Sequence, residues 1–167
     1  MLSWTKSPCR PKLSSRTGAW LRGLAANESP TYANNNAIVE AVGRGEVDFG
    51  LVNHYYNYRF LEEDPDLPSR NHVFPGDDLG SMLLASTVSE LAASDQREEA
   101  ERFVEYLLTE EAQRFFSDET FEYPLAEGVA PAAVLPPLGD VELPYDIDEL
   151  GEELEGTVRL IQASGLG

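Results

Sequence analysis

The architecture of this chain is set by the stretch VDFGLVNHYY, residues 47–56. Its first six residues, 47–52, are rich in branched and aromatic side chains and follow a glycine turn, a pattern that predicts a buried β-strand. The strand ends in an amide, an imidazole and two adjacent phenols, at Asn53, His54, Tyr55 and Tyr56. A strand does not need these groups for its own stability, so binding chemistry is expected here.

Helices are predicted on both sides of this strand. Before it, Asn35 or Asn36 can cap the start of a short helix, which a glycine ends before residue 46. After it, a second helix begins at His54 or Tyr55 and continues to about Glu63. A helix, a glycine turn and a buried strand in succession indicate an α/β fold.

Apolar periodicity predicts the remaining elements. They are the end of a helix over 19–26, a second buried strand over 80–85, an amphipathic helix from Ser94 or Asp95 to Leu108, a further helix capped by Thr109, an extended segment over 122–125, a loop over 128–140 and a terminal helix over 148–162. The apolar side chains of the two helices around Thr109, Phe115 and Phe116 among them, are expected to lie in the core.

Composition excludes several classes of protein. The 167 residues include 12 basic and 30 acidic ones, and the net charge of −18 would repel nucleic acid and anionic lipid. A single cysteine, Cys9, rules out an internal disulfide and a cysteine-based zinc site. No apolar run approaches the roughly 18 residues of a membrane span. Residues 1–18 are basic and lack the apolar segment of a signal peptide, so an irregular leader is expected there.

The end of the predicted strand has the chemistry of a metal site. Open α/β sheets bind ligands at the carboxyl ends of their strands. Tyr55 and Tyr56 would occupy the first turn of the next helix, where the helix dipole favours a phenolate over a phenol. Phenolates are hard donors suited to ferric iron, with His54 and Asn53 as a neighbouring ligand and hydrogen-bond donor. From the residues alone, a packed core edge with solvated hydroxyls remains the alternative.

Two longer strings carry a resemblance to a known family. Residues 37–59, AIVEAVGRGEVDFGLVNHYYNYR, closely resemble the segment around the iron-binding tyrosines of bacterial ferric ion-binding proteins. These are the extracytoplasmic solute-binding components of iron ABC transporters. Residues 103–131, FVEYLLTEEAQRFFSDETFEYPLAEGVAP, resemble the late helix pair and return segment of the same family. The resemblance covers roughly residues 19–150.

The resemblance implies an α/β fold of the periplasmic-binding-protein type II class, present only in part. The chain would hold most of the second lobe and the returning part of the first lobe, while the rest of the first lobe would lie upstream of residue 1. The implied segments are a leader at 1–18, a second-lobe segment with the tyrosine pair at 19–75, a first-lobe return at 76–125, and a crossing segment with the C-terminal helix at 126–167.

The resemblance also implies a set of site residues. In the family, two adjacent tyrosines bind Fe(III) in a cleft between the lobes, and they correspond to Tyr55 and Tyr56. A synergistic anion such as phosphate or carbonate is held by two asparagines, which correspond to Asn35 and Asn53, and His54 is a possible accessory residue. The implied partner is an ABC transporter permease, the implied location is periplasmic or extracytoplasmic, and no enzymatic reaction is implied.

Three alternatives remain open. A related binding protein could use the tyrosines as a hydrogen-bonding wall for another anion or a small organic solute. A fragment without its first lobe could be inert, because two tyrosinates and an anion leave much of the coordination sphere of Fe(III) open. A hydrolase could pair His54 or His72 with Ser81 or Ser86, but the chain has no Gly-x-Ser-x-Gly motif.

Overall fold

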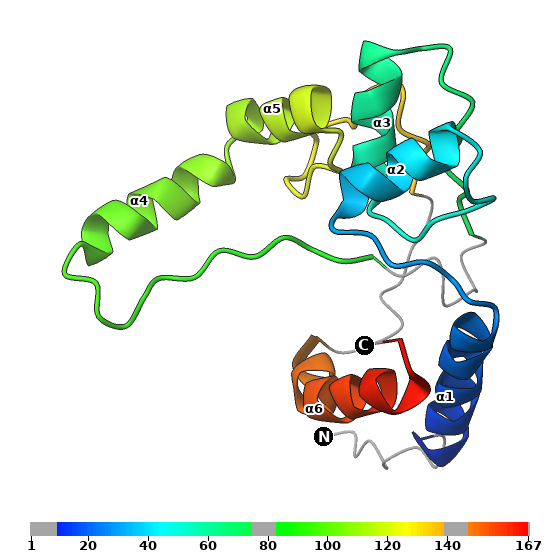
Figure 1. The fold of residues 1–167 in the computed structure, drawn as a ribbon. Helices are drawn as coiled ribbons and strands as arrows, with labels where there is room; N and C mark the ends of the chain where they lie inside the picture. The colour runs from blue at the N-terminus through cyan, green and yellow to red at the C-terminus, as the bar shows by residue number, and fades with distance from the viewer. Residues whose placement is uncertain (1–9, 75–82, 139–146, 167) are drawn as a thin grey trace. The chain divides into compact units, whose positions relative to one another are not determined.

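The computed structural model describes residues 10–74, 83–138 and 147–166. Six helices lie within these ranges (Figure 1): α1 Arg10–Ala26, α2 Asn35–Gly43, α3 His54–Glu63, α4 Arg97–Leu107, α5 Glu110–Thr120 and α6 Ile147–Ser164. The chain divides into two compact units. One contains α1 and α6, and the other, Tyr32–Glu142, contains α2 to α5.

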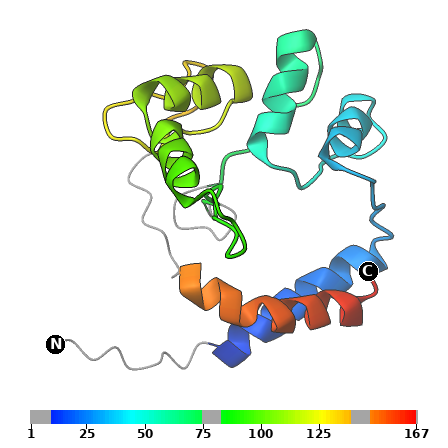
Figure 2. The same cartoon turned by 90° about the vertical axis from the view of Figure 1, so that its left-hand side faces the viewer.

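The first unit is a pair of helices. Helices α1 and α6 contact each other, and Figure 2 draws them crossing. Gly18 lies at this contact, where an added Cβ atom would be 3.7 Å from a methyl carbon of Leu160, an ordinary van der Waals distance. The predicted terminal helix is confirmed. The predicted irregular leader is wrong for residues 10–18, because α1 begins at Arg10 and gains its stability from a partner that is distant in sequence.

In the second unit, α2 packs against α3. Helix α2 buries Val39 and Ala41, and its N-terminus is capped by Asn34, whose Oδ1 accepts a hydrogen bond from the Ala37 amide at 3.0 Å. The predicted cap at Asn35 or Asn36 is therefore wrong by one or two residues. The predicted helix after the strand is confirmed, since α3 spans His54–Glu63.

The strand predicted at 47–52 is not formed. None of the residues that the structure describes belongs to a β-strand, and Phe49 and Leu51 are 70% and 60% exposed. A strand needs the backbone groups of a neighbouring strand, and no described segment supplies them here. Residues 80–82 of the second predicted strand lie outside the described residues, and 83–85 carry no regular structure.

Helices α4 and α5 occur where the periodicity predicts them. Thr109 caps α5, since its Oγ1 accepts a hydrogen bond from the Ala112 amide at 3.3 Å. The prediction that their apolar side chains form a core is only partly right. Helix α4 buries none of its residues, and Phe103 and Phe115 are 55% and 56% exposed, while Phe116 is half-buried. The periodicity identifies an apolar face but not what covers it.

Residues 109–135 form a self-contained region, here called the α5 corner. Helix α5 ends at Phe121, which adopts a left-handed conformation with φ of 59° and buries its ring. The chain then returns along α5, and Leu135 is buried near the end of this return. Buried Gln113 and Ser117 accept hydrogen bonds from backbone amides of the returning chain. The corner therefore closes through its own side chains.

Candidate metal and anion site

The start of α3 positions the two tyrosines. Asn53, the residue before the helix, has an extended backbone with φ of −68° and ψ of 139°. Its side chain makes no hydrogen bond to the helix end but donates from Nδ2 to the Tyr55 hydroxyl oxygen at 2.9 Å. The Tyr56 amide donates to the Asn53 carbonyl oxygen at 3.2 Å, which closes the first turn. Asn53 thus fixes both the helix start and the Tyr55 hydroxyl.

The tyrosine rings lie against each other and under one guanidinium group. Their centroids are 4.7 Å apart with planes inclined by 37°, and both residues are half-buried. The Cζ atom of Arg59 lies 5.2 Å from the Tyr55 centroid and 5.9 Å from the Tyr56 centroid. Arg59 was not among the residues predicted from the sequence. Its spacing of four and three residues from the tyrosines, which places all three on one helix face, is the signal that identifies it.

His54 faces a different set of groups. Its Nε2 donates a hydrogen bond to the Phe121 carbonyl oxygen at 2.8 Å, and its ring centroid lies 5.3 Å from that of Tyr123. Burial lowers the pKa of His54, and the bond to Phe121 and the charge of Glu122 offset part of this effect. Because Nε2 is used in holding α3 to the α5 corner, only Nδ1 remains for the predicted accessory role, and that role stays a prediction.

Asn35 stands apart from the other candidate residues. It is the first residue of α2 and is half-buried, at the helix end whose free amides and dipole favour an anion. Within the described residues, no hydrogen bond or ring contact joins Asn35 to Asn53, Tyr55 or Tyr56. The structure therefore brings together Asn53 and the tyrosines, and the assignment of Asn35 to an anion stays a prediction.

The donor set is one of phenols and amides. In the described part of the chain, no group of three or more His, Cys, Asp or Glu side chains is arranged to hold a metal ion. Phenolate oxygen is a hard donor, and hard, highly charged cations are the metals that match it. The residues present therefore fit Fe(III) better than a soft metal.

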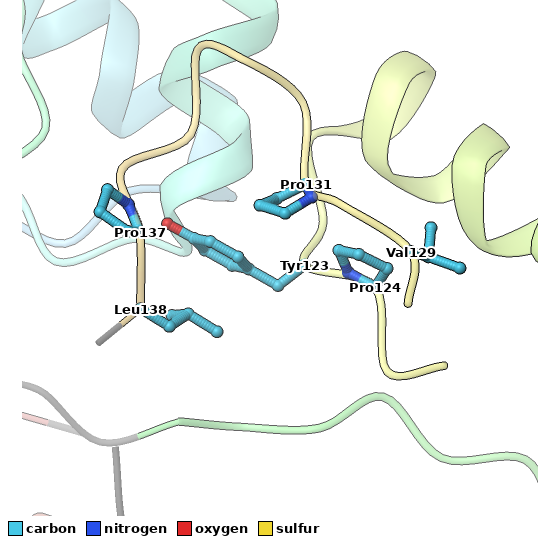
Figure 3. A pocket seen from close by; sticks show the side chains of 6 residues that line it. All are labelled: Tyr123, Pro124, Val129, Pro131, Pro137 and Leu138. Carbon is cyan, nitrogen blue, oxygen red and sulfur yellow. The ribbon is translucent and has the colours of Figure 1, made fainter. Parts of the chain in front are cut away.

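A separate pocket lies in the return segment of the α5 corner and beyond it. Its volume is about 240 Å³, and Figure 3 shows its lining of Tyr123, Pro124, Val129, Pro131, Pro137 and Leu138. The Tyr123 hydroxyl donates to the Pro136 carbonyl oxygen at 2.6 Å, and burial raises the pKa of this phenol. The tyrosine is thus used in closing the loop, and the pocket is an apolar feature distinct from the tyrosine pair.

The described residues among those considered for a hydrolase are not brought together. Ser81 lies outside the described residues, Ser86 is exposed in an irregular segment, and His72 is exposed beside Phe74. His54 uses Nε2 for Phe121. No described helix is both long and apolar enough to cross a membrane.

Comparisons with known proteins agree with the family resemblance found in the sequence. Residues 17–114 match the family of bacterial extracellular solute-binding proteins. The major ferric iron-binding protein of Neisseria meningitidis serogroup A is 32% identical over 149 residues, which are 88% of this chain and 45% of that protein. Iron uptake protein A1 of Synechocystis is 31% identical over 157 residues, 89% of this chain and 44% of that protein.

A solved structure extends the comparison to three dimensions. Iron-bound HitA from Pseudomonas aeruginosa matches with a TM-score of 0.83 at 32% identity, over 95% of this chain and 51% of that chain. This likeness confirms the fold class predicted from the sequence, including its partial character. The chain spans about half the length of the relatives that it matches.

Proposed function

Because the chain belongs to the bacterial extracellular solute-binding proteins, we propose that it binds Fe(III) as the cargo of an ABC-type iron importer. The observation that carries the proposal is the contact between the Tyr55 and Tyr56 rings at the start of α3. Relatives named as ferric iron-binding proteins support it, as does the likeness to iron-bound HitA. The proposed location is periplasmic or extracytoplasmic, and the proposed partner is the permease of the transporter.

The two phenols would bind the metal as tyrosinates. Fe(III) displaces the phenolic protons because its own charge stabilises the phenolate oxygens, and the helix dipole at the start of α3 acts in the same direction. The hydrogen bond that the Asn53 side-chain amide donates to the Tyr55 oxygen becomes stronger once that oxygen is negative. Asn53 therefore favours the metal-binding form of Tyr55 and holds the oxygen in place.

A synergistic anion, such as phosphate or carbonate, would share the coordination of Fe(III). Tyrosinates alone leave coordination positions open, and an anion prevents water and hydroxide from occupying them. Asn35 is the proposed anion-binding residue together with Asn53, since α2 begins there with free backbone amides. No bond in the cargo is made or broken, so the proposed function is binding and delivery rather than catalysis.

Visible spectroscopy tests the proposal. Adding ferric nitrilotriacetate in phosphate or carbonate buffer should produce a tyrosinate-to-iron charge-transfer colour, which Tyr55→Phe and Tyr56→Phe should each lose. Tyr106→Phe is the matched control, because Tyr106 is an exposed tyrosine of α4. A colourless wild-type protein, or colour retained in Tyr55→Phe, would contradict the proposal. Anion binding by a colourless protein in calorimetry would instead favour a different solute.

A further inference from the structure

His54, the first residue of α3, is held at both its backbone and its ring. Its carbonyl oxygen accepts a hydrogen bond from Asn71 Nδ2 at 3.1 Å. Its ring Nε2 donates to the carbonyl oxygen of Phe121, 67 residues along the chain, at 2.8 Å. The two bonds tie the start of α3 to the loop that follows this helix and to the end of α5.

The backbone of Phe121 is strained at the point where it meets His54. Its φ of 59° and ψ of 32° lie in the left-handed region, which is unfavourable for a residue with a side chain and where a helix usually ends in glycine. The Phe121 ring is buried and lies 5.9 Å from the Tyr58 ring between centroids, which favours phenylalanine over glycine here. This turn also sets the direction of the Phe121 carbonyl group. Strained backbone that its surroundings hold in place is frequent where functional groups are positioned.

The imidazole of His54 in turn contacts the tyrosine that follows it. The His54 and Tyr55 rings meet edge to face, with centroids 5.6 Å apart and planes inclined by 74°. The imidazole also lies 5.3 Å from the Tyr123 ring and 6.2 Å from the Tyr58 ring between centroids. His54 therefore connects a carbonyl group fixed in the α5 corner with the ring of Tyr55.

We propose that His54 is a positioning residue for Fe(III) binding, which holds the Tyr55 ring in place through the hydrogen bond to Phe121 and does not itself bind the metal. This inference deepens the proposed function and rests on it. A binding group must be held to within about 0.5 Å of its productive place by packing and by hydrogen bonds from its neighbours. Asn53 holds the Tyr55 oxygen, and His54 holds the ring that carries this oxygen.

The order of the Tyr55 ring in the metal-free chain tests the positioning role. With ¹³C-labelled tyrosine rings, the Tyr55 signals are assigned by their loss in Tyr55→Phe. His54→Phe keeps a ring but has no donor, so ¹³C relaxation should show a more mobile Tyr55 ring. His54→Gln keeps a donor for the Phe121 carbonyl oxygen and should recover part of the order. His72→Phe, at an exposed site, is the matched control and should leave the ring unchanged.

Two outcomes would overturn the proposal. One is a Tyr55 ring as ordered in His54→Phe as in the wild type, and the other is a ring no more ordered in His54→Gln than in His54→Phe. Circular dichroism verifies that each variant folds. If His54→Phe does not fold, Asn71→Ala decides, because it frees the backbone of His54 and leaves the imidazole intact. An unchanged Tyr55 ring in Asn71→Ala would then overturn the proposal.

Iron binding separates a positioning role from a ligand role. In competition with citrate, His54→Phe should lower the Fe(III) affinity about tenfold, as for a group that supports a metal ligand, and His54→Gln should recover part of it. Electron spin-echo spectra of the chain loaded from ferric citrate should lack the coupling of a directly bound imidazole nitrogen. Such a coupling, present in the wild type and lost in His54→Gln, would overturn the proposal. A wild-type chain that stays colourless contradicts the proposed function, whereas the ring order of the metal-free chain decides the positioning role, so the two failures are distinguishable.

Discussion

The α5 corner and the stretch 47–59 that carries the tyrosine pair belong to the same unit but are stabilised in opposite ways. In the corner, the buried Gln113 side chain accepts hydrogen bonds from the Leu125 and Ala126 amides and donates to the Leu107 carbonyl oxygen at 2.8 Å. Ser117, which is fully buried, accepts from one more returning amide at 2.7 Å. The corner supplies both partners of the bonds to its returning amides, and α4 supplies the Leu107 carbonyl.

The stretch 47–59 has fewer internal contacts of this kind. Phe49 is exposed, and residues 47–52 make no backbone hydrogen bond with the part of the chain that the structure describes. The Asn53 side chain donates to the Tyr55 hydroxyl oxygen rather than capping α3. An amide that capped the helix would contribute more to helix stability. The difference teaches that the corner closes through its own side chains, whereas the stretch 47–59 leaves an apolar side chain and backbone groups uncovered.

The largest effect is expected from breaking the closure of the corner. Gln113→Ala removes the acceptor for two backbone amides and the donor to one carbonyl, which should cost about 3 kcal/mol of unfolding free energy because the abandoned groups stay desolvated. Urea denaturation followed by circular dichroism measures this loss. Gln162→Ala, at an exposed site on α6, is the control and should change stability by less than about 0.5 kcal/mol. Equal effects would show that the corner does not depend on its internal bonds.

Sequence patterns predicted the helices well because helices form from local information. The cap at Thr109 and the extent of α3 follow from residues within a few positions of each other. The composition of 47–52 is that of a strand, but a strand also requires backbone partners, and no local sequence pattern reveals whether these are present. The start of α1 at Arg10 was missed for the same reason, because α6 supplies its partner from the far end of the chain.

The candidate site was predictable where its residues are adjacent in sequence. Asn53, Tyr55 and Tyr56 are such a set, and the family resemblance is what predicts Fe(III) as their ligand. His54 could not be interpreted from spacing, since its hydrogen-bond partner Phe121 is 67 residues away. The buried role of Gln113 was missed too, because glutamine in an amphipathic helix is ordinarily exposed.

An intermediate effect is expected from the charge over the tyrosine rings. Arg59→Gln should lower Fe(III) affinity about tenfold, because the guanidinium orders both tyrosine rings and favours negatively charged phenolate oxygens. This value is at the lower end of the loss seen when a group that supports a metal ligand is removed. Arg59→Lys should recover only part of the affinity, since ammonium lacks the planar stacking surface. Competition with nitrilotriacetate measures the affinity. Arg102→Gln, which breaks an exposed pair with Glu98, should leave it unchanged, and an unaltered affinity in Arg59→Gln would remove Arg59 from the site.

The smallest effect is expected where the two regions join, at His54. Because burial lowers the pKa of His54 in the folded protein, the unfolded chain binds the proton more tightly. The resulting stability is fully present above the unfolded pKa of about 6.5, declines as the pH falls below it, and levels off beneath the lowered folded-state value. His54→Gln, which can still donate to the Phe121 carbonyl, should flatten the difference in urea midpoint between pH 7.5 and pH 5. His72→Gln, at an exposed site, should keep the wild-type difference. If His54→Gln and wild type respond in parallel, the imidazole does not connect proton binding to the contact between α3 and the α5 corner.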